Sequence, residues 1–392
     1  MKKYDLIIVG CGAMGSAAMY QAAKRGLAVL GIDRFAPPHE MGSSHAETRF
    51  TRLGVGEGAQ YAPLVARSHE IWRELEEASG EVIFYQKGLL IVAPKGGTAK
   101  EQYNHWENFV ERSAEVAADI GVPFEILEAA DVRSRYPKVM LTDEEYAGFE
   151  PTGGHVMAER AVAVQLELAQ KNGAELWTNR PVEAIRPNEN GVTVVTAEGT
   201  VEAEKVIVTA GAWTNDFLPT VEHKNFRVTR QIVFWFEVDD PDQYSPDELP
   251  GVLWVGQKLE DYFAAFTLPP GSKPGLKVLT EQYVDATNAN HVEREISPAE
   301  IEAFYQKFGT QKIAGLKPNC IKASVCLYTH TPDDHFVIDM HPELGERVMV
   351  VSACSSHGFK HSAAIGEAVV QKMCEGESEI SLTPFAWQRL KR

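Results

Sequence analysis

Residues 5–33 read DLIIVGCGAMGSAAMYQAAKRGLAVLGID, and this stretch decides the fold of the N-terminal region. An apolar run ends at a glycine-rich turn, a helical segment follows, and a second apolar run ends at Asp33. In such a unit Gly10 allows the tight turn, Gly12 lets a pyrophosphate approach the backbone, and Gly15 lets the helix pack on the strand. The helix N-terminus attracts phosphate, and Asp33 is placed to accept hydrogen bonds from ribose hydroxyls. The segment therefore predicts adenine-dinucleotide binding and disfavours a 2′-phosphate.

A secretory signal peptide is the rival interpretation of this region, because Lys2 and Lys3 precede the apolar run. Asp5 and the three glycines interrupt the apolar core that such a peptide needs, and the pattern continues into a second strand. We therefore interpret the segment as part of the folded protein.

Composition limits the class of protein and its partners. The chain has 392 residues, 44% of them hydrophobic, which is enough for two domains with a sizeable core. No apolar run approaches the roughly 20 residues that span a bilayer. The net charge of −17 repels phosphate backbones and anionic membranes, so we expect small-molecule partners and neither nucleic acid nor membrane. Five cysteines without C-x-x-C spacing indicate no disulfide framework and no zinc site, and no metal is implied by the histidines, which fits a reducing cytoplasm.

Hydrophobic periodicity predicts the elements along the rest of the chain. Residues 37–58 read as a loop that carries glycines and histidines. Helices are expected at residues 61–79, 157–171, 298–308 and 362–373, and strands at residues 89–92, 192–195, 200–203, 205–209, 231–238, 262–268, 276–279, 336–340 and 348–351.

These elements predict an α/β (α+β) fold with two domains, because strand–helix units alternate at both ends of the chain and strand-like runs dominate its middle. A Rossmann-like dinucleotide-binding domain is expected from residues 1–82, 150–226 and 320–392. A mainly antiparallel β-sheet substrate domain is expected to be inserted twice, as residues 83–149 and 227–319.

Three further stretches are more restrictive than the glycine fingerprint. They are GSSHAETRFTR at residues 42–52 with GEG at residues 56–58, VCLYTHTPD at residues 325–333, and SHGFK at residues 356–360. With the fingerprint, and over essentially the whole length, they resemble the family of monomeric sarcosine oxidases and N-methyltryptophan oxidases. The resemblance implies FAD as the cofactor, oxidation of a secondary amine that carries a carboxylate, and O2 as the acceptor, which becomes hydrogen peroxide. It also favours a monomer.

Cys326 matches the position that, in this family, is joined by a thioether to the 8-methyl carbon of the flavin. A thiolate adds to that electrophilic position, and cations such as Arg49 or His45 favour the thiolate. Apart from the resemblance, a lone cysteine is most often a buried apolar thiol. The resemblance therefore implies covalent FAD attached through Cys326.

Arg52 and Lys360 match the family's pair that holds the substrate carboxylate. The planar guanidinium of arginine can bind a carboxylate through two hydrogen bonds, and the lysine ammonium adds a second positive charge. The alternative is that both residues form surface salt bridges. Lys277 resembles the family's lysine near the flavin N5, implicated in oxygen activation, and Lys273 is its rival. Four residues after Lys277 the family usually has a histidine, and this chain has Glu281. A carboxylate there repels an anionic substrate tail and attracts a cationic or hydroxylated one, unless it lies on the outer face of its strand.

Tyr328 lies two residues after Cys326, on the same face of an extended strand, where its hydroxyl can meet the substrate nitrogen. His357 precedes a glycine before the C-terminal helix, so it and the following N–H groups can face the flavin pyrimidine edge. Ser43, Ser44 and Thr48 can donate to phosphate or flavin oxygens. The residues expected to be catalytic are Lys277, Arg49, Tyr328 and His357, those expected to bind substrate are Arg52, Lys360 and Glu281, and those expected to bind cofactor are Gly10, Gly12, Gly15, Asp33, Ser43, Thr48, Val182, Gly211, Cys326, Gly358 and Lys360.

Two rival functions belong to other classes. A nicotinamide-dependent dehydrogenase uses the same glycine fingerprint, and a flavin-containing protein can keep its cofactor for structure or partner binding without turnover. Among oxidases, a fructosyl-amine or a bulkier N-methyl amino acid competes with sarcosine as the substrate. The amine itself is left open by the sequence.

Overall fold

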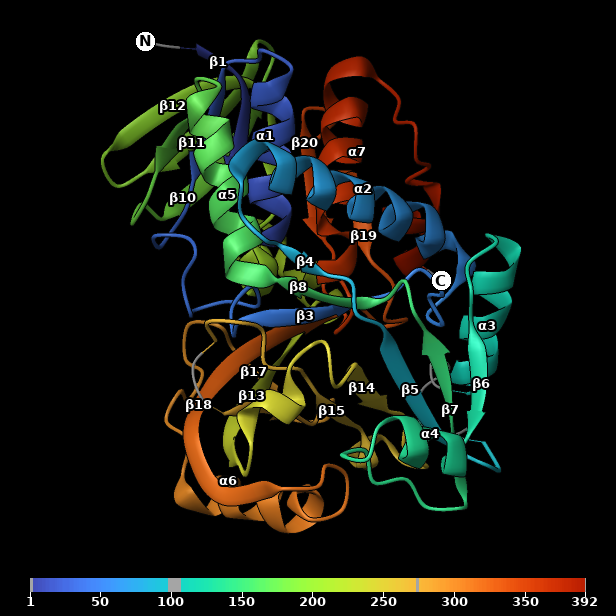
Figure 1. Ribbon diagram of the computed structural model, residues 1–392. Coiled ribbons are helices and arrows are strands. Elements are labelled where there is room, and N and C mark those ends of the chain that lie inside the picture. The colour runs from blue at the N-terminus through green and yellow to red at the C-terminus, as the bar shows by residue number, and fades with distance from the viewer. Residues whose placement is uncertain (1–2, 98–106, 273–274, 392) are drawn as a thin grey trace.

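The computed structural model describes residues 3–97, 107–272 and 275–391. Two large sheets organise these residues into two halves, and Figure 1 shows a small third sheet between the halves. Lys273, the rival of Lys277, lies outside the described residues.

The first large sheet is built around parallel strands. β1 pairs in parallel with β2 on one side and β12 on the other, and β20 extends the parallel part beyond β12. β12 runs unbroken through the two strands expected at residues 200–203 and 205–209, because its exposed and buried positions keep alternating through Glu204. Within the described residues this sheet has eight strands, β1 (Lys3–Val9), β2 (Val29–Ile32), β9 (Glu175–Trp177), β10 (Val182–Asn188), β11 (Gly191–Thr196), β12 (Gly199–Val208), β19 (Val337–Met340) and β20 (Val348–Ser352).

Four helices pack together beside this sheet in the upper half of Figure 1. They are α1 (Ala13–Lys24), α2 (Ala62–Ser79), α5 (Ala158–Lys171) and α7 (Ser362–Glu375). α1 contacts both α5 and α7, and the approach is close because small residues line the contact, since a Cβ added at Gly366 would overlap Ala17. The sheet and the helices share one apolar core, so the helix that begins at the glycine-rich turn is rigidly held.

The second large sheet is mainly antiparallel, as the sequence predicts. Its strands pair in antiparallel fashion except β5 with β14, which is parallel. Within the described residues it has nine strands, β5 (Leu89–Pro94), β6 (Glu125–Glu128), β7 (Glu145–Glu150), β13 (Arg227–Val238), β14 (Gly251–Trp254), β15 (Phe263–Ala265), β16 (Leu276–Leu279), β17 (Ala286–Thr287) and β18 (Leu316–His330).

β18 is the long curved strand at the lower left of Figure 1, and it pairs with β13 along most of its length. Periodicity does not predict it, because its first half is largely exposed and carries polar residues. The strand hydrogen-bonds within the second sheet, although the sequence groups residues 320–392 with the dinucleotide-binding region. Its C-terminal end carries Cys326 and Tyr328 toward the boundary between the halves.

Helices on the outside of the second half are short. The helix expected at residues 298–308 ends early, because a π-helical turn over Tyr305–Gly309 follows it. The helices are α3 (Phe109–Asp119), α4 (Ala129–Arg135) and α6 (Pro298–Phe304). Short 3-10 helices lie at Ala59–Tyr61, Gly211–Phe217, Thr220–Asn225, Pro241–Tyr244, Leu259–Asp261, Phe359–His361, Thr383–Phe385 and Trp387–Lys391.

The small sheet consists of β3 (Thr48–Thr51), β8 (Gly154–Met157) and β4 (Phe84–Tyr85). The sequence predicts only a loop at residues 37–58, whereas β3 forms inside that region. The strand escapes local prediction because its partner, β8, lies about a hundred residues further along the chain. β3 carries Arg49, and it leads directly into Arg52.

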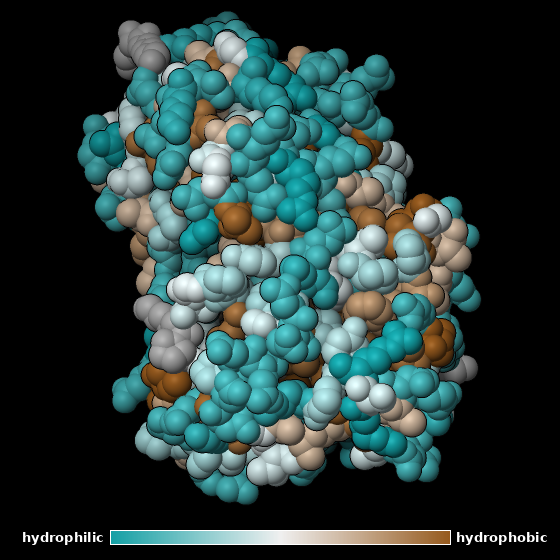
Figure 2. All heavy atoms as spheres, in the orientation of Figure 1, coloured by the Kyte–Doolittle hydropathy of each residue, from teal (hydrophilic) through white to brown (hydrophobic). Residues whose placement is uncertain are grey.

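The face of the molecule in Figure 2 is mostly hydrophilic, with apolar side chains in small separate groups. Of the helices in the described ranges, none is long and apolar enough to cross a membrane. No group of three or more His, Cys, Asp or Glu side chains suited to a metal ion occurs in the part of the chain that the structure describes. All five cysteines are free.

Candidate active site

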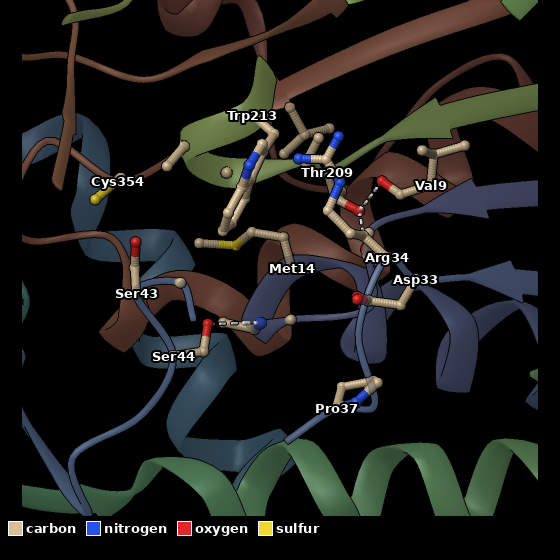
Figure 3. Close-up of a pocket in the computed structure, with 18 of the residues that line it drawn as sticks. Val9, Met14, Asp33, Arg34, Pro37, Ser43, Ser44, Thr209, Trp213 and Cys354 are labelled. Carbon is tan, nitrogen blue, oxygen red and sulfur yellow. Dashed lines mark hydrogen bonds between the residues drawn. The ribbon is translucent and has the colours of Figure 1, made fainter. Parts of the chain in front are cut away.

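A large cavity, here called the dinucleotide cavity, opens at the glycine-rich turn (Figure 3). Its empty volume, open solvent at the mouth included, is about 1310 Å³. The predicted cofactor-binding residues that line it are Gly10, Gly12, Asp33, Ser43, Val182, Gly211 and Gly358.

The glycine-rich turn has the backbone geometry that its residues predict. Gly10 has φ +90°, a left-handed conformation that favours glycine. A Cβ added at Gly15 would overlap the Gly10 carbonyl oxygen, so this residue holds α1 close to the turn. Ser44 Oγ accepts a hydrogen bond from the Ala13 backbone N–H at 3.0 Å, as Figure 3 shows. Ser44 thereby uses one backbone donor at the start of α1, whose first residues line this cavity, the position of an anion site.

Asp33 is buried at the end of β2, with its carboxylate beside the cavity. It accepts hydrogen bonds from the backbone N–H groups of Cys11 at 2.7 Å and Phe35 at 2.8 Å. Gly211 has φ +54°, and no atom lies within 4 Å of an added Cβ, so its backbone faces open space. The turn, the carboxylate and the open backbone together fit an adenine dinucleotide.

A second cavity adjoins the first, with an empty volume of about 920 Å³. The two cavities share four wall residues, Arg49, Tyr328, Ser356 and Phe359. The second cavity brings together residues from distant parts of the sequence, namely Phe50, Arg52, Glu57, Tyr262, Phe266, Glu281, Tyr283, Cys326, His357 and Lys360.

Two buried cations converge in the second cavity on one buried carboxylate. Arg52 donates to Glu57 at 2.7 Å, and Lys360 Nζ donates to the other oxygen of Glu57 at 2.9 Å. Burial raises the pKa of Glu57, but the two cations outweigh it and hold that pKa well below its usual range. Burial lowers the pKa of Lys360 to about 8, although Glu57 opposes that shift. The group thus carries two cations and one anion at neutral pH.

Cys326 lies in the wall of the second cavity and is 1% exposed. Its sulfur is 3.4 Å from His45 Nε2 and 3.9 Å from an Arg49 guanidinium nitrogen. Burial raises the pKa of the thiol, and Arg49 and Lys277 oppose the rise. Burial and neighbouring cations lower the pKa of His45 to about 3, so His45 is neutral and is not one of the cations that favour a thiolate.

Lys277 lies behind the wall formed by Arg49 and Phe266. Its Nζ donates to the Thr48 carbonyl at 2.5 Å and lies 3.9 Å from the centre of the Phe266 ring. Burial, and then the charge of Arg49, hold its pKa well below the usual range. The sequence leads us to expect a fixed cation at this position. Burial and the neighbouring guanidinium both weaken the tendency of the Lys277 amine to hold its charge.

Glu281 faces the second cavity, which excludes the alternative that it lies on the outer face of its strand. It is 6% exposed, and burial raises its pKa to about 7. Tyr328 donates to one carboxylate oxygen at 3.0 Å, and Tyr283 donates to the other.

His357 follows a turn in which Ser355 and Ser356 have left-handed backbone conformations, with φ 37° and φ 65°. Its ring stacks on Phe336 at 4.6 Å between centroids, and its Nε2 lies 3.3 Å from the Asp334 carbonyl oxygen. A Cβ added at Gly358 would overlap a backbone carbonyl oxygen, so the turn requires glycine there. Strained residues of this kind often mark functional turns.

Several residues that shape the site were missed by sequence reasoning. Glu57 lies in one of the motifs that carry the family resemblance, but the sequence does not show that its carboxylate contacts both Arg52 and Lys360. Tyr283 lies two residues after Glu281 on an extended segment, a spacing that could have indicated the contact. Cys354 lines the dinucleotide cavity, and only the fold places it there.

Comparisons with known proteins agree with this geometry. The model of the family described as FAD dependent oxidoreductase matches residues 5–372. The chain is 35% identical to monomeric sarcosine oxidase of Bacillus sp. (strain NS-129), covering 98% of this chain and 97% of the relative. It is 34% identical to N-methyl-L-tryptophan oxidase of Yersinia pestis (strain Pestoides F), covering 99% and 100%.

Solved structures share the fold at lower identity. The open form of NikD, an amino acid oxidase of nikkomycin biosynthesis, aligns with a TM-score of 0.83 and 22% identity over 98% of both chains. Fructosyl amine:oxygen oxidoreductase from Aspergillus fumigatus aligns with a TM-score of 0.77 and 18% identity, covering 98% of this chain and 89% of the other. At these identities the likeness concerns the fold alone.

A dinucleotide cavity that shares a wall with a buried, charged cavity is the arrangement of an oxidoreductase. The chain belongs to the FAD-dependent oxidoreductase family, and it is an FAD-dependent oxidase whose relatives are sarcosine oxidases and N-methyltryptophan oxidases. The comparisons confirm the predicted family, the fold class and FAD as the cofactor. They disagree with the rival hypothesis of a nicotinamide-dependent dehydrogenase.

Proposed function

We propose that this protein oxidises secondary amines that carry a carboxylate, such as N-methyl amino acids, on FAD attached through Cys326. The observation that carries the proposal is the pair of buried cations, Arg52 and Lys360, in a cavity that adjoins the dinucleotide cavity. The names of the relatives support the same reaction class.

Arg52 supplies the first argument for a carboxylate. Its guanidinium uses one nitrogen on Glu57, while its buried Nε has no hydrogen-bond partner among the described residues. A buried donor without a partner is costly, and an incoming carboxylate oxygen would satisfy it. Lys360 adds a second charge beside the same carboxylate, so the substrate's acidic end is drawn to this side of the cavity.

The dinucleotide cavity supplies the residues that would hold FAD. Gly10, Gly12 and the start of α1 would receive the pyrophosphate, and Asp33 the ribose. The chemistry supplied by bound FAD is two-electron oxidation of the amine to an imine, which water hydrolyses, with the electrons passed to O2 to form hydrogen peroxide.

The chain's own residues then orient the substrate and place protons. Arg52 and Lys360 would bind the carboxylate, and Tyr328, on the shared wall, would lie beside the substrate with its hydroxyl held by Glu281. Arg49 places positive charge in that wall, and Lys277 lies behind it with its Nζ on the Thr48 carbonyl. His357 closes the cavity on the side of the C-terminal helix. Each group stabilises charge that develops during the reaction without having to move.

Attachment of FAD through Cys326 is a two-electron oxidation that needs O2 as the oxidant. The Cys326 thiol would lose its proton and form a carbon–sulfur bond at the flavin 8-methyl carbon in place of one hydrogen, and O2 would be the oxidant that takes up the two electrons as hydrogen peroxide. Arg49, 3.9 Å from the sulfur, favours the thiolate that this step needs. Before cofactor binding the buried thiol is protonated, because burial raises its pKa.

Acid precipitation of the purified yellow protein tests the attachment. We expect the pellet to stay yellow for the wild type and for Cys354→Ser, a matched control because Cys354 lines the dinucleotide cavity. Cys326→Ser should release the colour to the supernatant. A colourless wild-type pellet would contradict covalent attachment of the flavin.

Peroxide release tests the reaction. Sarcosine, other N-methyl amino acids and fructosyl amino acids should be compared with the corresponding N-methyl amines that lack a carboxylate. We expect peroxide only from substrates with a carboxylate. Turnover of the carboxylate-free amines at equal efficiency, or no turnover of any secondary amine, contradicts the proposal, and the second result favours a protein that keeps its flavin for structure.

A further inference from the structure

Glu281 places an acidic group in the same cavity as Arg52 and Lys360. Both of its carboxylate oxygens accept a tyrosine hydroxyl, from Tyr328 and from Tyr283. Each carboxylate oxygen has two acceptor sites, so each keeps one for a further donor. Tyr283 is held in turn by Ser356, whose Oγ lies 3.4 Å from its hydroxyl. The carboxylate is therefore fixed in orientation and still able to receive a ligand.

The second cavity contains charges of both signs. Arg52 and Lys360 contact Glu57, and Glu281 lines the same cavity and interacts electrostatically with Lys360. Part of the cations' charge is neutralised by Glu57, but Glu281 has no direct ion pair with Arg or Lys among the described residues. A cavity that contains charges of both signs complements a compact zwitterion.

We propose that Glu281 binds the ammonium group of the substrate and accepts its proton, so that the amine is a free base before it is oxidised. This inference rests on the proposed function and identifies the substrate as a zwitterionic amino acid. The proton moves from the substrate nitrogen to a Glu281 oxygen, the nitrogen keeps its electron pair, and no oxidant or reductant takes part. Tyr328, on the shared wall, hydrogen-bonds to the same carboxylate and orients it toward the reacting end.

The pKa of Glu281 is consistent with this role. Burial raises it to about 7, Tyr283, Tyr328 and Lys360 act in the opposite direction, and Glu57 raises it further. The remaining titratable or charged groups that face the same cavity are Arg49, Arg52, Tyr262, Cys326, Asp334 and His357. A carboxyl that titrates near neutral pH can take a proton and release it again.

A pair of ligands with the same shape tests the acidic subsite without turnover. N,N,N-trimethylglycine carries a permanent cation and cannot be oxidised as a free base, and 3,3-dimethylbutanoate has the same shape and carboxylate with an uncharged carbon in place of the nitrogen. Their affinities for the flavin-loaded protein can be measured by calorimetry and by perturbation of the flavin absorbance. We expect the wild type to prefer the cation by about tenfold or more near pH 8, because Glu281 is then ionised. The preference should fall toward one near pH 6, where Glu281 is protonated.

The ratio of the two affinities isolates Glu281 from its neighbours. Lys360, with a pKa of about 8, also loses charge as the pH rises, but this weakens both carboxylate ligands alike. Glu281→Gln should abolish the preference at every pH. Tyr283→Phe keeps the carboxylate but removes a donor that lowers its pKa, so the transition should move to higher pH. A merely structural role for Glu281 moves neither quantity.

Each outcome separates this inference from the proposed function. Equal affinity for the two ligands in the wild type near pH 8, including failure of both to bind, overturns the inference, and so does a preference that survives in Glu281→Gln. If amines with a carboxylate yield peroxide while the ligand pair shows no preference, only the role of Glu281 is wrong. If the preference appears without peroxide from any amine, the acidic subsite stands and the proposed function fails.

Discussion

At the scale of single residues, the site depends on charges that are buried together. Arg52, Glu57 and Lys360 are each less than 7% exposed, and they are joined by hydrogen bonds of 2.7 and 2.9 Å. A buried charge is tolerated because its partners are also buried, and removal of one partner leaves the others without compensation. The stability of the second cavity and the proposed binding of a carboxylate therefore depend on the same three side chains.

Glu57→Gln should lower the free energy of unfolding by about 3 kcal/mol at neutral pH, because two buried cations lose their shared carboxylate. The folded-state pKa of Glu57 lies below that of the unfolded chain, so the difference from the wild type should shrink as the pH falls through the folded-state value. Urea unfolding at several pH values measures both effects. Glu70→Gln removes an exposed partner of Arg67 and should cost less than about 1 kcal/mol. Equal costs for the two variants would contradict the importance of burial.

At the scale of elements, the short strand β3 decides where Arg49 and Arg52 lie. Two carboxylates from distant segments hold its ends. Glu159 accepts the backbone N–H groups of Ala46 and Glu47, both at 2.9 Å, where the chain turns into the strand with left-handed φ values.

Glu150, at the end of β7, holds the other side of this strand. It accepts the N–H groups of Leu53 at 2.7 Å and Gly54 at 2.8 Å, directly after Arg52. A four-residue strand paired with one neighbour is marginal by itself, so these charged hydrogen bonds contribute much of its positioning.

Glu150→Gln should lower stability by about 2 kcal/mol and raise the KM for the amine several-fold, because an amide NH2 would face a backbone N–H and displace Arg52. Peroxide kinetics and thermal unfolding measure the two changes. Glu111→Gln is the control, since Glu111 accepts a surface hydrogen bond from Tyr146 and lies away from β3. A variant that loses stability but keeps the wild-type KM would disprove the positioning role.

At the scale of the whole molecule, the site exists because the two halves meet. The second half supplies Cys326, Tyr328 and Glu281, and β3 and the C-terminal turn supply the cations. A loop after β17 also reaches back to the dinucleotide cavity. There Asn290 Oδ1 accepts hydrogen bonds from Arg34 at 2.6 Å and from Trp213 at 2.8 Å. Arg34 and Trp213 both line that cavity (Figure 3).

Asn290→Ala should therefore speed the release of non-covalent FAD by about tenfold, because two hydrogen bonds that join the halves at the cavity are lost. The rate is best measured by flavin fluorescence in the Cys326→Ser background, where no thioether can hold the cofactor. Asn319→Ala removes a hydrogen bond to Glu237 within the second half and should leave the rate unchanged. Release at the same rate in both variants would show that the loop does not retain the cofactor.

The amino-acid sequence by itself determined the dinucleotide-binding unit, since the turn at Gly10, the contact at Gly15 and the position of Asp33 follow from residues that are near one another in the chain. It also determined the family, through motifs whose residues line both cavities. Only the tertiary structure decided that Glu281 faces the second cavity, that Glu57 lies between Arg52 and Lys360, and that β18 belongs to the second sheet. The physical reason is that burial, ion pairing and strand pairing depend on groups far apart in the chain, whereas turn geometry and helix formation depend on near neighbours.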